Sequence, residues 1–197
     1  MSIVILKYNA GNIQSVQFAL ERIGVQATVT DDKEKLESAD KVIIPGVGEA
    51  STAMNYLKEK ELDKVIVSLK QPVLGICLGM QLLCQFSEEN DINCLGIFNT
   101  VKVRKFDATD TNMKVPQIGW NNIFDLKSKL FNSVIENSYC YFVHSYFAEQ
   151  NQYSIATTEY IQPYSSAMQK GNFYGVQFHP EKSAKTGEQI LKNFLTL

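Results

Sequence analysis

The segment Pro72-Val73-Leu74-Gly75-Ile76-Cys77-Leu78-Gly79-Met80-Gln81 leads an apolar run into a cysteine that has a glycine two positions away on either side. The run at 73–77 predicts a buried strand, and residues 80–86 predict a helix. A strand, a tight turn and a helix form the nucleophile elbow of hydrolases, here with sulfur in place of a serine oxygen. We therefore expect Cys77 to project from the end of a sheet, on a turn whose backbone is strained.

Cys77 is the candidate nucleophile. It precedes the first turn of the expected helix, where unpaired amides and the helix dipole favour an anion such as a thiolate. The commoner role of a cysteine is that of a small buried side chain. We expect that role for Cys84, which lies in the apolar helical run, and for Cys94 and Cys140.

Strand and helix patterns alternate in the first half of the chain. Strands are expected at 3–6, 25–29, 41–44 and 73–77, and helices at 13–23, 51–60 and 62–69. Continuous apolar strands separated by helices predict a parallel sheet that is covered on both faces.

Alternating patterns are more frequent in the second half. They predict strands at 95–106, 139–147, 153–160 and 174–178, several of them antiparallel, and a final helix at 184–195. Within 139–147, alternation places Tyr139, Tyr141 and Phe147 on one face and His144 on the other. The predicted fold is α/β, with a central mixed, mostly parallel sheet flanked by helices and an additional antiparallel strand region.

Composition narrows the class of protein. The chain has 197 residues, 45% of them hydrophobic, and a net charge of −2, which predicts a single domain over 1–197 and no nucleic-acid partner. No run reaches the roughly 18 apolar residues of a membrane span, and the start resembles a strand more than a signal peptide. Four cysteines without a C-x-x-C pair indicate neither a zinc site nor a disulfide scaffold, and no cofactor motif is present. A cytoplasmic location is expected.

A thiolate nucleophile needs a proton carrier, and the chain has two histidines. His179 directly precedes Pro180, which disfavours helix and keeps the segment extended. Residues two apart in an extended segment point the same way, so the Glu181 carboxylate can accept a hydrogen bond from one ring nitrogen while the other faces the sulfur. His144 has no acidic residue within two positions and is the weaker candidate for the base.

Acyl chemistry also needs donors for an oxyanion. The amide of Leu78, directly after the nucleophile, is one candidate. The second is expected from Pro45-Gly46-Val47-Gly48, because this loop follows the strand before that of Cys77 and ends at the same edge of the sheet. Its glycines permit an amide to turn or to approach a ligand closely.

Together these features resemble the class I (triad) glutamine amidotransferases, which have a Cys-His-Glu site. Within that class the chain is similar to the glutaminase subunits of imidazole glycerol phosphate synthase, from histidine biosynthesis. The matching segments run in family order along nearly the whole chain: Pro45-Gly46-Val47-Gly48, Gly75-Ile76-Cys77-Leu78-Gly79-Met80-Gln81-Leu82-Leu83, Ser87-Glu88-Glu89, Gly119-Trp120-Asn121, Phe142-Val143-His144-Ser145-Tyr146 and Gly175-Val176-Gln177-Phe178-His179-Pro180-Glu181-Lys182-Ser183. Gln117 departs from the family, which often has histidine there.

The resemblance implies a role for each matching position. Cys77 is the nucleophile, His179 the acid and base, and Glu181 the residue that orients His179. The implied binding and interface positions are Gln81 and Glu89 at the glutamine head group, the backbone of Ser145 and Tyr146 near its carboxylate, an amide of Gly46–Gly48 that must turn to complete the oxyanion hole, and Trp120 and Tyr141 toward a partner.

The implied reaction is hydrolysis of L-glutamine to glutamate and ammonia. In the family, the ammonia passes to a (β/α)8-barrel cyclase subunit of the heterodimer. There it reacts with a phosphoribosyl aminoimidazole carboxamide substrate to give imidazole glycerol phosphate and aminoimidazole carboxamide ribotide. The glutaminase is slow until the cyclase binds its substrate.

Two other functions stay open on the sequence. One is the glutaminase subunit of another ammonia-channelling synthase, such as that of anthranilate or pyridoxal phosphate synthesis, or a related amide hydrolase; the G-W-N and F-V-H-S-Y segments argue against it. The other is a non-catalytic regulatory relative, against which the complete Cys77, His179 and Glu181 set argues.

Overall fold

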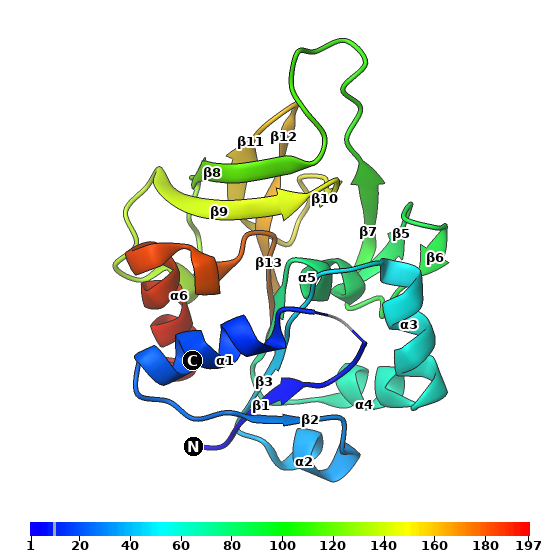
Figure 1. Cartoon of the computed structure of the whole chain (residues 1–197), viewed down its shortest axis with the longest axis vertical. Helices are drawn as coiled ribbons and strands as arrows, with labels where there is room; N and C mark the ends of the chain where they lie inside the picture. Colours follow the sequence, from blue (N-terminus) through cyan, green and yellow to red (C-terminus); the bar gives the residue numbers. More distant parts are fainter. Residues whose placement is uncertain (10) are drawn as a thin grey trace.

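A seven-stranded sheet forms the centre of the computed structural model, which describes residues 1–9 and 11–197 (Figure 1). The strands lie in the order β11-β12-β13-β4-β3-β1-β2. Neighbours from β13 to β2 are parallel: β13 (Phe173–Val176), β4 (Val73–Ile76), β3 (Lys41–Ile44), β1 (Ile3–Leu6) and β2 (Thr28–Thr30). β12 (Pro163–Lys170) and β11 (Ser154–Glu159) extend the sheet in antiparallel pairing.

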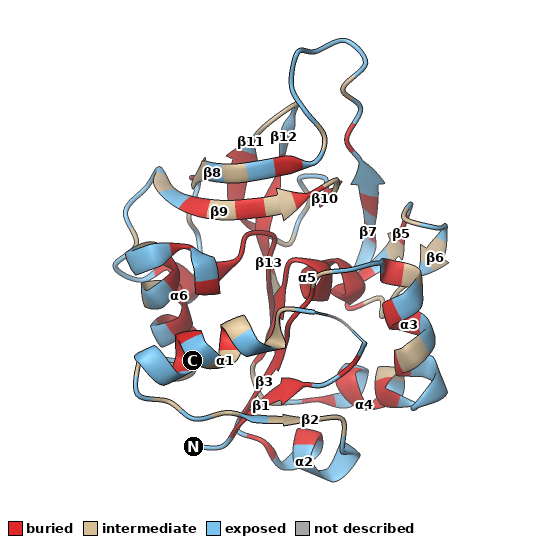
Figure 2. Ribbon diagram, in the orientation of Figure 1, coloured by how far each residue is buried: buried red, intermediate tan, exposed pale blue. Residues whose placement is uncertain are grey.

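Helices cover both faces of this sheet. One face packs against α1 (Ile13–Arg22) and α6 (Ala184–Thr196). The other packs against α2 (Lys33–Ser38), α3 (Ala50–Glu59), α4 (Leu62–Ser68) and α5 (Leu78–Leu83). Alternate side chains of each inner strand enter opposite cores, which is why the strands are apolar without interruption. Figure 2 shows these strands as continuously buried.

Two smaller sheets lie against the central one. The first has the order β10-β7-β5-β6, with bounds Tyr146–Ala148, Phe98–Lys105, Cys84–Ser87 and Ile92–Asn93. The second is the antiparallel pair β8 (Gln117–Ile123) and β9 (Ser138–His144), which crosses the end of the large sheet in Figure 1. Two short 3₁₀ helices, η1 (Lys129–Phe131) and η2 (Pro180–Lys182), complete the fold. The predicted α/β fold, mostly parallel with an added antiparallel region, is confirmed.

Four local predictions are wrong. The segment from His179 to Glu181, expected to be extended, turns after His179 into the 3₁₀ helix η2, because Pro180 occupies the first position of that helix. The helix expected at 80–86 ends at Leu83, because Cys84 pairs with Phe98 of β7 and begins a strand. The strand expected at 25–29 lies at Thr28–Thr30. Phe147 does not share the face of Tyr139 but is buried, because at residue 145 the chain leaves its pairing with β8 and joins β7, which rotates the side chains that follow.

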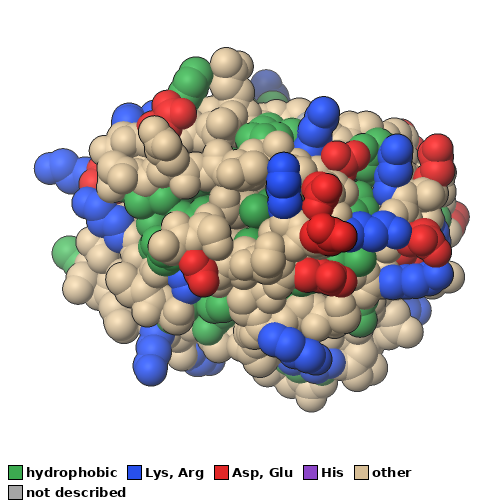
Figure 3. All heavy atoms as spheres, turned by 90° about the horizontal axis from the view of Figure 1, so that it is seen from below, with side chains coloured by type: hydrophobic (Ala, Val, Ile, Leu, Met, Phe, Trp, Pro, Cys, Tyr) green, Lys and Arg blue, Asp and Glu red, His purple; other side chains and the backbone are tan. Residues whose placement is uncertain are grey.

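The surface gives little further indication of function. Lysine, arginine, aspartate and glutamate side chains are interspersed on the face seen in Figure 3, without a large area of one sign. None of the helices in the described part of the chain combines the length and the hydropathy that a membrane span requires. Within the same residues, no group of three or more His, Cys, Asp or Glu side chains is arranged to hold a metal ion.

Candidate active site

Cys77 stands on a strained turn at the carboxyl end of β4, directly before α5. Its φ of 50° and ψ of −107° are unusual for a residue with a side chain. The two flanking glycines are required by space, because a Cβ on Gly75 would lie 2.6 Å from the carbonyl oxygen of Gly79, and a Cβ on Gly79 would lie 2.0 Å from that of Ile44. The structure therefore has the geometry of a nucleophile elbow, as predicted.

His179 and Glu181 form a buried pair beside this elbow. Nδ1 of His179 lies 2.7 Å from Oε1 of Glu181, and the side chains are 1% and 0% exposed. Burial alone would lower the pKa of His179, but its interactions with Cys77 and with the Glu181 carboxylate together raise that pKa to about 10. The ring thus lies between the carboxylate and Cys77, in surroundings that favour its protonated form.

The Glu181 carboxylate is held in turn by the segment that follows β1. The side-chain amide of Asn12 donates a short hydrogen bond to Oε1 of Glu181, the same oxygen that His179 contacts. The guanidinium of Arg22 lies 3.4 Å from the backbone oxygen of Glu181. These contacts fix the carboxylate, and through it the orientation of the imidazole.

A cavity of about 220 Å³ opens beside the sulfur. It is lined by Val47, Gly48, Cys77, Leu78, Gln81, Glu89, Pro116, Val143, His144, Ser145 and Tyr146. The side-chain amide of Gln81 donates to the backbone oxygen of Tyr146 at 2.9 Å and to Oε1 of Gln177 at 3.0 Å. Nε2 of Gln177 lies 3.5 Å from the Cys77 sulfur. Cys77 therefore lines the same cavity as all four residues that are predicted to bind a ligand: Gln81, Glu89, Ser145 and Tyr146.

Glu89 is half-buried and lines this cavity beside the N-terminus of α3. Its Oε2 accepts a hydrogen bond of 2.7 Å from the amide of Ala50. Burial is the main reason why the pKa of Glu89 is raised, and this amide opposes the shift. A carboxylate in such a place favours a cationic group of a ligand.

The loop after β3 lies beside the elbow, because β3 and β4 are neighbours in the sheet. The amide of Leu78 donates to the carbonyl oxygen of Gly46 at 3.4 Å. The Gly46–Val47 peptide therefore presents an oxygen, and not an N–H, toward the start of α5. In this orientation, the protein's own carbonyl uses one of the two predicted oxyanion donors.

Comparison with known proteins identifies the family. The protein-family model described as "Glutamine amidotransferase class-I" matches residues 4–197 of the sequence. The chain belongs to this family. The imidazole glycerol phosphate synthase subunit HisH of Bacteroides fragilis (strain YCH46) is 55% identical over 197 residues, 100% of both chains. The subunit of the same name from Haemophilus influenzae (strain ATCC 51907 / DSM 11121 / KW20 / Rd) is 45% identical over 99% of this chain and 97% of its own.

Solved structures agree on the fold. One described as a glutamine amidotransferase matches with a TM-score of 0.74 at 17% identity, covering 98% of this chain and 97% of its own. The structure of PurLQS from Thermotoga maritima matches with a TM-score of 0.65 at 14% identity, and the match covers 99% of this chain and 97% of that chain. The predicted membership of the class I glutamine amidotransferases is confirmed.

In this amidotransferase chain, His144 is a structural member of the cavity wall. Its Nδ1 lies 2.8 Å from the backbone oxygen of Tyr146, and its Nε2 lies 3.2 Å from the hydroxyl of Tyr164. Tyr164 also contacts Oε1 of Gln117 at 2.9 Å. The sequence predicted a packed histidine with one nitrogen satisfied, whereas both nitrogens have partners.

The buried His144 gives the fold a specific sensitivity to acid. Burial lowers the pKa of His144 from 6.5 to about 4. Between these values the unfolded chain binds a proton that the folded chain excludes, so this contribution to stability is complete above pH 6.5 and is lost as the pH falls toward 4. At pH 5 the loss is about 2 kcal/mol. His144→Asn keeps a donor for Tyr146 but cannot titrate.

We expect the difference in free energy of unfolding between pH 7.5 and pH 5 to be smaller by about 2 kcal/mol in His144→Asn than in the unmodified chain. Chemical denaturation at the two pH values measures it. Equal pH dependence in the two proteins would show that His144 is not kept neutral by burial.

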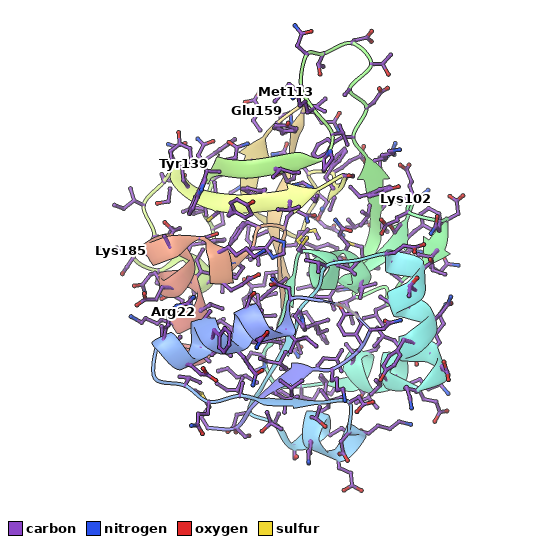
Figure 4. All side chains as sticks on the ribbon, in the orientation of Figure 1. Arg22, Lys102, Met113, Tyr139, Glu159 and Lys185 are labelled. Atoms are coloured by element: carbon purple, nitrogen blue, oxygen red, sulfur yellow. The ribbon has the colours of Figure 1, made fainter. Side chains whose placement is uncertain are left out.

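The outer face of β8 and β9 carries exposed apolar side chains. Trp120 pairs with Tyr141 across the strands, with ring centroids 5.9 Å apart, and Trp120 is 53% exposed. Ile118 and Tyr139 are also exposed, and Figure 4 shows Tyr139 at the outer end of β9. The backbone of this face reaches the site directly, because the Cys77 sulfur lies 3.7 Å from the carbonyl oxygen of Val143.

Sequence reasoning did not single out Gln177 and Asn12. Gln177 lies two residues before His179, in the last of the segments that match the family. Residues two apart on a predicted strand share a face, and this position was the available signal. Asn12 gave no such signal, because only the fold brings it to Glu181 across 169 positions of sequence.

Proposed function

We propose that this chain is the glutaminase subunit of an imidazole glycerol phosphate synthase. It hydrolyses L-glutamine to glutamate and ammonia and supplies the ammonia to a cyclase subunit. The observation that carries the proposal is the buried His179–Glu181 pair beside a cysteine on an elbow, 2.7 Å between Nδ1 and Oε1. The full-length similarity to the HisH relatives supports the choice of this synthase over other ammonia-channelling enzymes.

The side chains act in sequence. The Cys77 thiolate attacks the side-chain carbonyl carbon of glutamine and forms a tetrahedral oxyanion. The imidazolium of His179 then gives its proton to the departing nitrogen, so ammonia leaves and a glutamyl thioester remains. The neutral ring next accepts a proton from water as the water attacks the thioester, and glutamate is released. Glu181, fixed by Asn12, keeps the imidazole in orientation and stabilises its charge.

The oxyanion is held by backbone amides. Leu78 supplies one N–H at the start of α5. The second comes from the Gly46–Gly48 loop after the Gly46–Val47 peptide turns, which also removes the Gly46 carbonyl from the Leu78 amide. The orientation observed in the structure is thus a resting one.

Glutamine occupies the cavity that opens at the sulfur. Gln81 and Glu89 bind its head group, where the Glu89 carboxylate favours the α-ammonium. The backbone of Ser145 and Tyr146 lies near its carboxylate. Gln81 already fixes the Tyr146 carbonyl at 2.9 Å, which keeps this wall in place before the ligand arrives.

The partner is a (β/α)8-barrel cyclase subunit that docks on the outer face of β8 and β9. Trp120 and Tyr141 lie on this face, together with the exposed side chains of Ile118 and Tyr139. Exposed aromatic residues are frequent anchors of protein interfaces. A single domain over 1–197 and a cytoplasmic location are part of the same proposal.

The test is synthesis by the complex. The chain and the cyclase subunit are purified together, and formation of imidazole glycerol phosphate from the phosphoribosyl substrate is measured with glutamine or with an ammonium salt as the nitrogen source. We expect both sources to be used. A complex that uses ammonium but not glutamine would support the non-catalytic alternative, and failure to bind the cyclase would support another synthase.

A further inference from the structure

Tyr8 lies beside the Gly46–Gly48 loop and has no role in the proposed mechanism. It follows β1, which is the neighbour of β3 in the sheet, and Pro45 follows β3. The side chain is only 5% exposed. Its hydroxyl donates a short hydrogen bond to the backbone oxygen of Pro45, directly before the peptide that must turn.

The hydroxyl of Tyr8 also packs against Gly46. A Cβ on Gly46 would lie 2.6 Å from this oxygen and 2.8 Å from the Cβ of Leu78. The Tyr8 hydroxyl and the first residue of α5 therefore both pack closely against the Cα of Gly46. Burial, and after it the nearby Cys77 sulfur, raise the pKa of Tyr8, so the hydroxyl stays protonated and remains a donor.

These contacts restrict how the loop can rearrange. The Pro45–Gly46 peptide is held at its oxygen, and the Gly46 Cα is held by packing. Rotation is then confined to the next peptide, between Gly46 and Val47, whose carbonyl oxygen faces the Leu78 amide in the structure. A loop that turns about a fixed point places the Val47 N–H at one defined position.

We propose that Tyr8 is a positioning residue of the glutaminase reaction: its hydroxyl fixes the pivot about which the Gly46–Val47 peptide turns into the oxyanion hole. The inference rests on the proposed function. Tyr8 lies outside the triad and the cavity wall, yet the strength of the oxyanion hole depends on it. An oxyanion donor acts only when it is fixed close to its required position.

Tyr8→Phe removes only the hydroxyl and keeps the buried ring. In the complex with the cyclase and its phosphoribosyl substrate, we expect kcat for glutamine hydrolysis to fall on the order of tenfold, because a displaced donor loses part of its value. KM for glutamine should change by less than about twofold, since the hydroxyl does not line the cavity. Alkylation of Cys77 by iodoacetamide, which needs no oxyanion hole, should keep its rate.

The matched control is Tyr56→Phe. Tyr56 is partly buried, and its substitution also removes one hydrogen bond, of 2.9 Å to Asp31; among the described residues its hydroxyl makes no hydrogen bond to the loop or to the triad. Its kcat should equal that of the unmodified complex. A hydrogen-exchange measurement provides a readout besides activity: the buried amide of Leu78, which is bonded to the Gly46 carbonyl, should exchange about tenfold faster in Tyr8→Phe and at the original rate in Tyr56→Phe.

An unchanged kcat with unchanged exchange would overturn the proposal. So would a parallel fall in kcat and in the alkylation rate, which would indicate general disruption of the site. Absence of glutamine hydrolysis in the unmodified complex would instead count against the proposed function, and the exchange rates would still test the role of Tyr8.

Discussion

Cys77→Ala is expected to abolish glutamine-dependent synthesis by the complex while ammonia-dependent synthesis continues at its original rate. The thioester cannot form without the sulfur, so the fall in glutamine-dependent kcat should be at least about 10³-fold. In the proposed complex, the cyclase site lies on another chain and receives ammonia from solution in either case. Steady-state rates with each nitrogen source, measured on the same preparation, give both values.

Cys94→Ala is the matched control, because Cys94 is a free, half-buried cysteine outside the cavity. It should leave both rates unchanged. Glutamine use by Cys77→Ala near the original rate would refute the assignment of the nucleophile. Loss of both activities would show that the substitution disrupts the complex, and tryptophan fluorescence of Trp120 on cyclase binding would identify that outcome.

Glutamine hydrolysis by the chain alone is expected to be slower by about 10²-fold or more than in the complex with cyclase and phosphoribosyl substrate, since one missing oxyanion donor has an effect of that size. In the structure, the Gly46 carbonyl accepts from the Leu78 amide at 3.4 Å, so the resting loop lacks one donor and uses the other. Glutamate release, measured for the chain alone, with cyclase, and with cyclase and its substrate, tests this.

The three conditions separate two origins of activation. A rate that rises on adding cyclase alone would place the signal in docking on β8 and β9, whose Val143 carbonyl lies 3.7 Å from the sulfur. A rate that rises only with the cyclase substrate would place it in ligand binding by the partner. Full activity of the isolated chain would contradict the resting role of the loop.

Local pattern was sufficient where a feature depends on neighbours in sequence. The elbow at Cys77 was predictable because an apolar strand, two spaced glycines and a helix follow one another directly, and the close approach of Gly79 to Ile44 explains why no larger residue fits. The pairing of His179 with Glu181 was predicted from their closeness in sequence, but the expected extended geometry was wrong, because Glu181 lies in the 3₁₀ helix η2 directly after His179.

Features that depend on tertiary pairing were not predictable in this way. β8 and β12 are rich in polar residues, and pairing with β9 and β13 makes them strands. Cys84 leaves a helical pattern for the same reason. Asn12 and Tyr8 reach the site only because β1 lies beside β3, so their contacts with Glu181 and Pro45 join residues far apart in the chain.

Transfer of labelled nitrogen distinguishes direct passage of ammonia between the two subunits from its release into solution. The complex is given glutamine labelled with ¹⁵N at the side-chain amide, in a buffer that contains excess unlabelled ammonium at neutral pH. If Cys77 releases ammonia that passes directly to the cyclase site, the imidazole ring of the product carries the label despite the excess. A product that contains the unlabelled nitrogen of the buffer would show that ammonia from Cys77 does not pass directly to the cyclase.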